Sequence, residues 1–172
     1  MKSVQRPLAL AVLLVACAAK QDEPRVALTD VGFTLTLPRT MQQALDSLAP
    51  GFRTVPTTSF RSEVSQAAAA QGGMTAIFAA VGDFNHDGLT DAVVEGTMPG
   101  DSTLHVIAIM NGPKPTAVEV ARFLSYDADA VGIYLSNPPK GVAGAFEVVD
   151  YPDSTLLYQY TPGGFQETNV GK

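Results

Sequence analysis

Apolar and polar residues alternate from residue 32 onward, and this alternation predicts a first short strand over residues 32–37. Its apolar face carries Phe33, Leu35 and Leu37, and Pro38 ends it. A helix is predicted next, because Thr40 suits the N-cap position and Gln43, three residues later, completes a capping box. The apolar stripe of this helix consists of Met41, Ala44, Leu45 and Leu48, and Pro50-Gly51 ends it.

A second helix is predicted to start near Ser59 and to end at Gly72-Gly73, with inward-facing residues at helical spacing: Phe60, Val64, Ala67 and Ala68. From Met74 onward the pattern changes to short strands. The predicted strands cover residues 74–82, 91–97, 103–111, 117–124, 131–136, 144–150 and 155–161, with a further short one over 164–168. The segment 117–124 fits a short helix equally well.

Two helices followed by consecutive strands predict a fold of the α+β class. Turn residues such as Pro99-Gly100-Asp101 keep the connections between the strands short. Short connections favour an antiparallel, meander-type β-sheet. The length predicts a single domain over residues 31–172, and no internal repeat divides it.

The N-terminus has the pattern of an export signal. Lys2 and Arg6 form a basic region, and the nine apolar residues from Leu8 to Ala16 are too few to span a bilayer, which needs about 20. This stretch runs into Leu14-Val15-Ala16-Cys17, which resembles the lipobox of bacterial lipoproteins. The resemblance implies that the cysteine is lipidated and becomes the first residue of the mature chain. An ordinary signal peptide, or a buried apolar segment, is the alternative.

The lipobox divides the chain into a signal peptide (1–16), a lipid-anchored tether (17–30) and the domain (31–172). Ala18 and Ala19 follow Cys17, which resembles a signal for sorting to the outer membrane if the host is Gram-negative. We therefore expect an exported protein whose contact with the membrane is the lipid on Cys17. Because Cys17 is the single cysteine, no intrachain disulfide is expected.

The charge balance argues against nucleic acid and anionic lipid as partners. The whole chain has a net charge of −6, and loss of Lys2 and Arg6 with the signal would make it −8. No cluster of basic residues offsets this charge locally.

The most informative motif is the segment Asp83-Phe84-Asn85-His86-Asp87-Gly88-Leu89-Thr90-Asp91. Its oxygen-bearing side chains occupy loop positions 1, 3, 5 and 9, and the carbonyl of Leu89 offers a further oxygen. Gly88 at position 6 allows a sharp bend. This spacing builds a cage for a hard divalent cation, Ca²⁺. Position 12 is Val94 rather than glutamate, and the flanks are predicted strands, so the motif is not an EF-hand loop.

The stretch 77–96 resembles the calcium loops of FG-GAP/VCBS repeats, the integrin-like propeller blades in which a D-x-[DN]-x-D-G-x-x-D turn joins two strands. The resemblance implies metal ligation by Asp83, Asn85, Asp87, Asp91 and the carbonyl of Leu89. Propellers carry several such blades, whereas this chain has one loop, so the resemblance supports a strand–calcium loop–strand unit without a propeller. The family often has glycine at position 4, where this chain has His86, and histidine tolerates a positive φ better than most residues.

Other polar and aromatic residues have weaker patterns. We expect His86 to face solvent rather than to bind metal, and His105 to be a satisfied or exposed strand histidine rather than a general base. Asp127 and Asp129 fit a second acidic site less well than a solvated turn. Tyr158 and Tyr160 share a strand face and could form a ligand platform, although tyrosine is also common in half-buried strands.

These observations predict a non-enzymatic, calcium-binding lipoprotein of the cell envelope. It would act as a binding or structural module for a protein or glycan ligand. No catalytic motif supports an enzyme, but a calcium-dependent hydrolase with unidentified carboxylate groups is the alternative. Such a hydrolase needs a concave pocket with at least two ionisable groups outside the loop.

Overall fold

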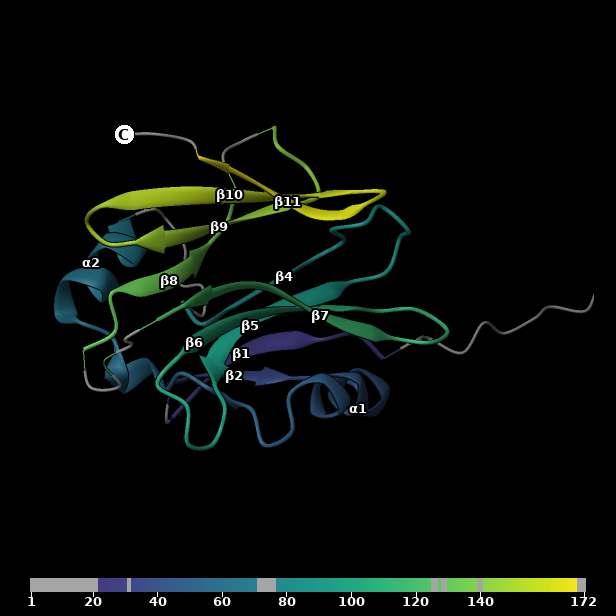
Figure 1. Cartoon of the computed structure of the whole chain (residues 1–172), viewed down its shortest axis with the longest axis horizontal. Coiled ribbons are helices and arrows are strands. Elements are labelled where there is room, and N and C mark those ends of the chain that lie inside the picture. Colours follow the sequence, from purple (N-terminus) through teal and green to yellow (C-terminus); the bar gives the residue numbers. More distant parts are fainter. Residues whose placement is uncertain are drawn as a thin grey trace, which may run out of the picture.

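The computed structural model of the chain describes residues 22–30, 32–70, 77–124, 127, 130–138 and 141–169. Strands hold 47% of these residues and helices 16%, and the strands form three separate antiparallel sheets (Figure 1). The predicted α+β arrangement, two N-terminal helices followed by one meander-type sheet, is therefore wrong. The molecule is mainly β.

A β-hairpin, rather than a helix, is the first described element. Its strands β1 (Arg25–Thr29) and β2 (Gly32–Thr36) pair antiparallel, with Val26 opposite Leu35. Residues 25–29 belong to the segment that the sequence analysis assigned to the tether. Their apolar side chains are flanked by charged residues, and they become a strand because β2 supplies the partner.

Both predicted helices exist, with different starts. Helix α1 (Arg39–Leu48) begins directly after Pro38 and has no side-chain cap, so the capping box at Thr40 is wrong. A 3₁₀ turn η1 (Thr57–Ser59) and a bridge from Phe60 to Val131 precede α2 (Ser62–Ala70). The predicted helix start near residue 59 is therefore three residues early. The glycines predicted to end this helix lie outside the described residues.

The central sheet is five-stranded and contains the most buried strands. Strand β5 pairs on one side with β6, which pairs with β7, and on the other side with both β3 and β4. The strand bounds are β3 (Arg53–Thr54), β4 (Ala79–Gly82), β5 (Asp91–Thr97), β6 (Leu104–Met110) and β7 (Thr116–Phe123). The strand predicted at 91–97 is confirmed, and of the segment 117–124 all residues but Leu124 belong to strand β7 rather than to a helix.

The last four strands form a sheet of their own. They are β8 (Ile133–Ser136), β9 (Ala145–Asp150), β10 (Ser154–Thr161) and β11 (Gly164–Asn169), and each pairs with its neighbour in sequence. The strands predicted to form one meander-type sheet are therefore divided after β7, and β8 to β11 do not continue the central sheet.

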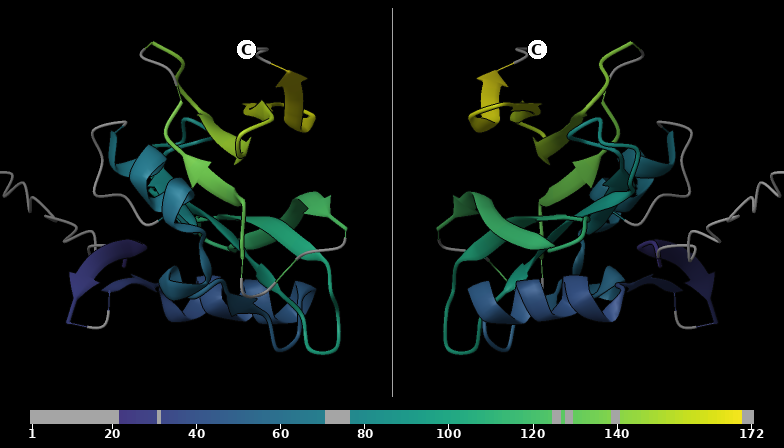
Figure 2. Two further views of the ribbon diagram at one scale, coloured as in Figure 1. Left: turned by 90° about the vertical axis from the view of Figure 1, so that its left-hand side faces the viewer. Right: turned by 90° about the vertical axis from the view of Figure 1, so that its right-hand side faces the viewer.

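The sheets and α1 are stacked in layers, with the four-stranded sheet and α1 on opposite faces of the central sheet (Figures 1 and 2). Along β6, alternate residues enter two different hydrophobic clusters. Ile107 and Ile109 join Met41 and Leu45 of α1, whereas residues such as Val106 join the four-stranded sheet. Both faces of β5 and β6 are therefore covered, which explains their nearly continuous apolar sequence.

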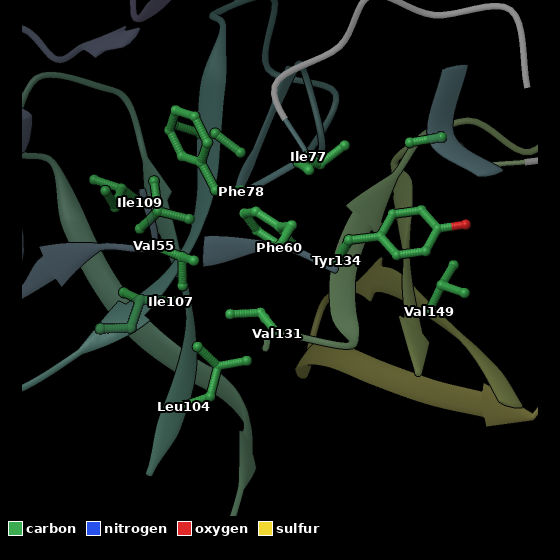
Figure 3. Packing of buried hydrophobic residues seen from close by; sticks show 14 of the residues in the cluster. Val55, Phe60, Ile77, Phe78, Leu104, Ile107, Ile109, Val131, Tyr134 and Val149 are labelled. Carbon is green, nitrogen blue, oxygen red and sulfur yellow. The ribbon is translucent and has the colours of Figure 1, made fainter. Parts of the chain in front are cut away.

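The first cluster extends past the edge of the central sheet toward α2. Figure 3 shows Phe60 and Val131 in the centre of this cluster, with Ile107 on one side and Tyr134 and Val149 on the other. The bridge between Phe60 and Val131 therefore helps to join α2 to β8. Among the described helices, none is long and apolar enough to cross a membrane.

Candidate metal centre

The predicted metal loop connects β4 to β5, so its two ends are held by neighbouring antiparallel strands. Gly82 pairs with Asp91, which closes the loop at its base. Two loop residues have left-handed backbone conformations, His86 with φ of 61° and Gly88 with φ of 85°. The expectation of a positive φ at His86 is confirmed. These two positions turn the backbone amides that follow them toward the inside of the loop.

The first three predicted ligands share these inward-facing amides. The N–H of Asp87 donates to Asp83 Oδ1 at 3.1 Å and to Asn85 Oδ1 at 3.0 Å, so both oxygens approach the same nitrogen. Gly88 N–H donates to Asp83 Oδ2 at 2.9 Å, and Leu89 N–H donates to Asp87 Oδ1 at 2.9 Å. The amide of Asn85 donates to Asp87 Oδ2 at 3.0 Å. The side chains at positions 1, 3 and 5 therefore converge.

Asp91 has a different environment because it is completely buried at the start of β5. Its Oδ2 accepts the N–H of Phe84 at 3.0 Å, and its Oδ1 accepts the N–H of Asn111 at 2.7 Å. This carboxylate ties the beginning of the loop to the end of β6. Burial raises its pKa, hydrogen bonds from the two amides act in the opposite direction, and the nearby Asp87 carboxylate raises it further.

Phe84, at loop position 2, fixes the loop to the core. Its ring is buried, and it contacts Phe146 and Phe165 edge-on at centroid distances of 5.8 and 6.3 Å. Truncation of such a buried ring to alanine typically costs about 3–5 kcal/mol. The loop thus has a hydrophobic attachment to the four-stranded sheet in addition to its strand ends.

Gly144 provides a second point of contact between the loop and that sheet. A Cβ atom at Gly144 would lie 2.6 Å from Phe84 O and 2.7 Å from His86 Nε2, so the loop packs directly on the glycine backbone. The carbonyl of Gly144 also accepts the N–H of Tyr160 at 2.9 Å, which links this position to β10. His86 itself is exposed, as expected.

The donor set fits a hard cation. All the predicted ligand atoms are oxygens, the ligand type that Ca²⁺ takes. Each side-chain oxygen that accepts one N–H keeps a second lone pair for a cation. Across the described residues, no three carboxylate, imidazole or thiol side chains already stand in position around one ion. Asp83, Asn85 and Asp87 would therefore form the first part of the site, and ligation by Asp91 and by the Leu89 carbonyl stays a prediction.

His105 lies outside this loop, and both of its ring nitrogens have acidic partners. Nδ1 lies 2.5 Å from Glu119 Oε1, and Nε2 lies 3.1 Å from Asp101 Oδ2. Burial acts to raise the pKa of Glu119, but hydrogen bonds from Arg122 and His105 outweigh it and hold the pKa below its ordinary value. The expectation of a satisfied strand histidine is confirmed. The carboxylates of Glu119 and Asp101 lie at different nitrogens of the imidazole ring. The two carboxylates and the imidazole therefore do not surround a common ion position.

The other candidate residues that the structure describes have surroundings of their own. Tyr158 is buried and its hydroxyl donates to Glu167 Oε2 at 2.7 Å, so it serves the core rather than an open platform. Tyr160 is half-buried beside Phe165. Asp127 lies at a cavity described below. Cys17 and Asp129 are outside the described residues.

Three positions of this site were not found in the sequence. An aromatic residue within a polar loop, such as Phe84, is a sequence signal that could have indicated that the loop is anchored in the core. Asn111 is the last residue of the predicted strand 103–111 and had no sequence signal of a role in the loop, although its N–H donates to Asp91. Gly144 had no sequence signal, because its role depends on a loop about sixty residues away and on the packing of two sheets.

Comparison of the chain with protein-family models, with curated proteins and with solved structures finds no match. The resemblance of the loop to FG-GAP/VCBS repeats stays a prediction from its residues.

Proposed function

We propose that this protein is a non-enzymatic, calcium-binding lipoprotein of the cell envelope that acts as a binding or structural module. The observation that carries the calcium proposal is the convergence of Asp83, Asn85 and Asp87 on the loop's own amides. Positive φ angles at positions 4 and 6 make this convergence geometrically accessible. Hard oxygen donors at loop positions 1, 3 and 5 are what a calcium loop supplies.

Calcium would stabilise the domain because it compensates charges that repel one another. Three carboxylates belong to the loop, and the charge of Asp87 acts to raise the pKa of Asp91. A bound divalent cation reduces the local charge from −3 to about −1. Because the loop contacts both β5 and the four-stranded sheet, this compensation would stabilise the contact between the two sheets as well as the loop.

The size of the effect follows from mass action. Extracellular calcium modules bind with dissociation constants of about 0.1–1 mM. At about 1 mM free Ca²⁺ and a constant of about 0.1 mM, the free energy of unfolding rises by about 1.4 kcal/mol. For a domain of this length the melting temperature should rise by about 3–6 °C.

Thermal melts in EGTA and in Ca²⁺ test the proposal. Wild type should melt at a higher temperature in Ca²⁺, and Asp87→Ala should melt at the same temperature in both buffers. Asp153→Ala is the matched control, because it removes an exposed aspartate of another turn and should keep the calcium response. Equal melting temperatures for wild type in the two buffers would show that the loop is an acidic turn without a calcium site.

The envelope part of the proposal rests on the N-terminal sequence. Lipid on Cys17 would hold the domain at a membrane surface, with the outer membrane as the destination in a Gram-negative host. A protein or glycan of the envelope is the class of partner that this location offers.

The hydrolase alternative has one observation in its favour, which is that two carboxylates, Asp127 and Asp150, line one cavity together with two arginines. No imidazole, thiol or hydroxyl side chain is among its described lining residues. Arginine does not exchange protons at any working pH. We therefore favour a binding site, and hydrolysis of a bound peptide by wild type but not by Asp150→Asn would support the alternative.

A further inference from the structure

A cavity of about 600 Å³ lies where the segment before α2 meets the ends of β7, β8 and β9. Its volume falls within the range of about 300–1,000 Å³ that is usual for small-molecule sites. None of its described lining residues belongs to the 83–91 loop, so it is distinct from the candidate metal centre. Its walls are partly apolar, and the charged groups among its described lining residues are Arg61, Arg122, Asp127 and Asp150.

Arg61 is fixed in this cavity by backbone contacts at both ends. Its main-chain N–H donates to Val131 O at 3.1 Å, and its Nη2 donates to Tyr151 O at 3.0 Å. The guanidinium lies across Gly132, where a Cβ atom would stand 1.6 Å from Nη2. Gly132 is therefore required for this close approach. A guanidinium has five N–H donors, so the bond to Tyr151 leaves others for a ligand.

Asp150 is held at the same cavity by the ends of two strands. It is the last residue of β9 and pairs with Ile133 of β8, and its carbonyl accepts the N–H of Asp153 at 2.7 Å. Arg61 and Asp150 thus carry opposite charges into one cavity. Among the described residues, no ion pair joins them, whereas Arg122 is already paired with Glu119. Two opposite charges that line a common space without pairing with each other are complementary to a ligand that carries both charges.

We propose that this cavity binds a small zwitterion with an apolar side chain, either a free amino acid or a dipeptide. Its carboxylate would accept hydrogen bonds from Arg61, for which the planar guanidinium is well suited. Its ammonium group would bind Asp150, and its side chain would contact apolar lining residues such as Phe123 and Ile133. This inference rests on the proposed role as a binding module, but not on calcium binding.

Isothermal titration calorimetry of the full chain in nonionic detergent tests the proposal. The zwitterionic probes are L-leucine and L-leucyl-L-leucine. The matched controls are 4-methylpentanoate, which lacks the ammonium group, and 3-methylbutylamine, which lacks the carboxylate. We expect saturable binding of at least one zwitterion and at least tenfold weaker binding of both singly charged compounds, because each lacks one charge-assisted hydrogen bond. The result should be the same in EGTA and in Ca²⁺.

Two variants locate the binding to the cavity. Asp150→Asn and Arg61→Gln should each weaken binding of the zwitterion at least tenfold. Asp153→Asn and Arg53→Gln make the same changes outside the cavity and should bind as wild type does. Arg61→Gln also loses a structural bond to Tyr151, so Asp150→Asn, which is isosteric, decides the matter if Arg61→Gln does not fold.

Three results would overturn this proposal. The first is that neither zwitterion gives saturable heat at ligand concentrations up to about 10 mM. The second is that a singly charged analogue binds as tightly as the zwitterion. The third is that Asp150→Asn binds the zwitterion with the same affinity as wild type. None of these results bears on the calcium proposal, which is tested by the melts in EGTA and Ca²⁺.

Discussion

Glu95 is the most unusual single residue of the domain. It lies in β5 opposite Val106 and is completely buried. Its main chain is bonded to Phe78 and Val55, yet within the described part of the chain neither carboxyl oxygen has a hydrogen-bond partner. Burial raises the pKa of this carboxyl well above its ordinary value, because the charged form would lose its hydration without compensation.

A raised pKa in the folded state predicts a loss of stability as the pH rises. Below the ordinary pKa of glutamate, Glu95 is protonated in both the folded and the unfolded chain, so the free energy of unfolding has its full value there. Above it the unfolded chain releases the proton while the folded chain keeps it. The free energy of unfolding then falls by about 1.4 kcal/mol per pH unit until the folded-state pKa is reached. Glu95→Met removes this dependence with a side chain of similar size.

Urea unfolding of wild type and Glu95→Met in EGTA, at pH 5 and pH 8, measures the effect. The free energy of unfolding of Glu95→Met relative to wild type should be clearly higher at pH 8 than at pH 5, because the raised pKa of Glu95 destabilises wild type as the pH rises. The substitution Glu23→Gln, at an exposed position, should show no such difference. An advantage of equal size at the two pH values would mean that Glu95 is not a neutral buried acid.

At the scale of elements, the predictions succeeded where local pattern and tertiary packing agree. The strand at 91–97 was predicted with its observed bounds, because a β-branched apolar run follows the loop and both faces of β5 are covered. The capping box failed because Pro38 already sets the helical entry, and Thr40 falls inside the first turn. Strand β1 was missed because its pairing with β2, rather than its own composition, makes it a strand.

The loop between β4 and β5 and the four-stranded sheet should be coupled through Gly144. Gly144→Ala forces a Cβ against Phe84 O and His86 Nε2, and it also places alanine at a φ of 66°. We expect a lower melting temperature and a smaller calcium-dependent rise than in wild type, because the loop must shift to make room. Thermal melts in EGTA and Ca²⁺ measure both quantities.

Gly141→Ala is the control that separates the clash from the backbone strain. Gly141 also has a positive φ, 91°, but no atom of the described residues lies within 4 Å of the position of its Cβ. Both variants therefore carry a left-handed alanine, which costs about 1–2 kcal/mol. If the calcium-dependent rise of Gly144→Ala equals that of Gly141→Ala, the loop does not depend on its contact with the four-stranded sheet.

At the scale of the whole molecule, the division into three sheets was beyond the reach of the sequence. Strands β7 and β8 follow one another in the chain, and the pattern gave no sign that β8 leaves the central sheet. What separates them is packing: Val106 and Ala108 of β6 contact the four-stranded sheet through a shared cluster with Leu135 and Phe146. The turn geometry of the 83–91 loop, with its positive φ at His86, was predictable because the residues of the loop are contiguous, and its metal chemistry is a proposal. The charges of the cavity were not predictable, because Arg61 and Asp150 are 89 residues apart in the sequence.

The attachment of the molecule to a membrane depends on Cys17 alone in our interpretation. A lipoprotein signal is cleaved before the cysteine only after the thiol has been lipidated, as the resemblance to the lipobox implies. Cys17→Ser should therefore leave the precursor uncleaved and without lipid. Mass spectrometry of the purified protein should find residues 1–16 still attached and no added acyl chains.

Fractionation with detergent provides the second readout for this variant. Wild type should partition with membranes after a high-salt wash, because acyl chains and not surface charge hold it there. Asp153→Asn, carried through the same procedure, shows whether an unrelated surface substitution alters the partitioning. Recovery of a processed, acylated and membrane-bound product from Cys17→Ser would remove the lipoprotein interpretation. The calcium and zwitterion proposals would be unaffected, because their residues lie in the folded domain.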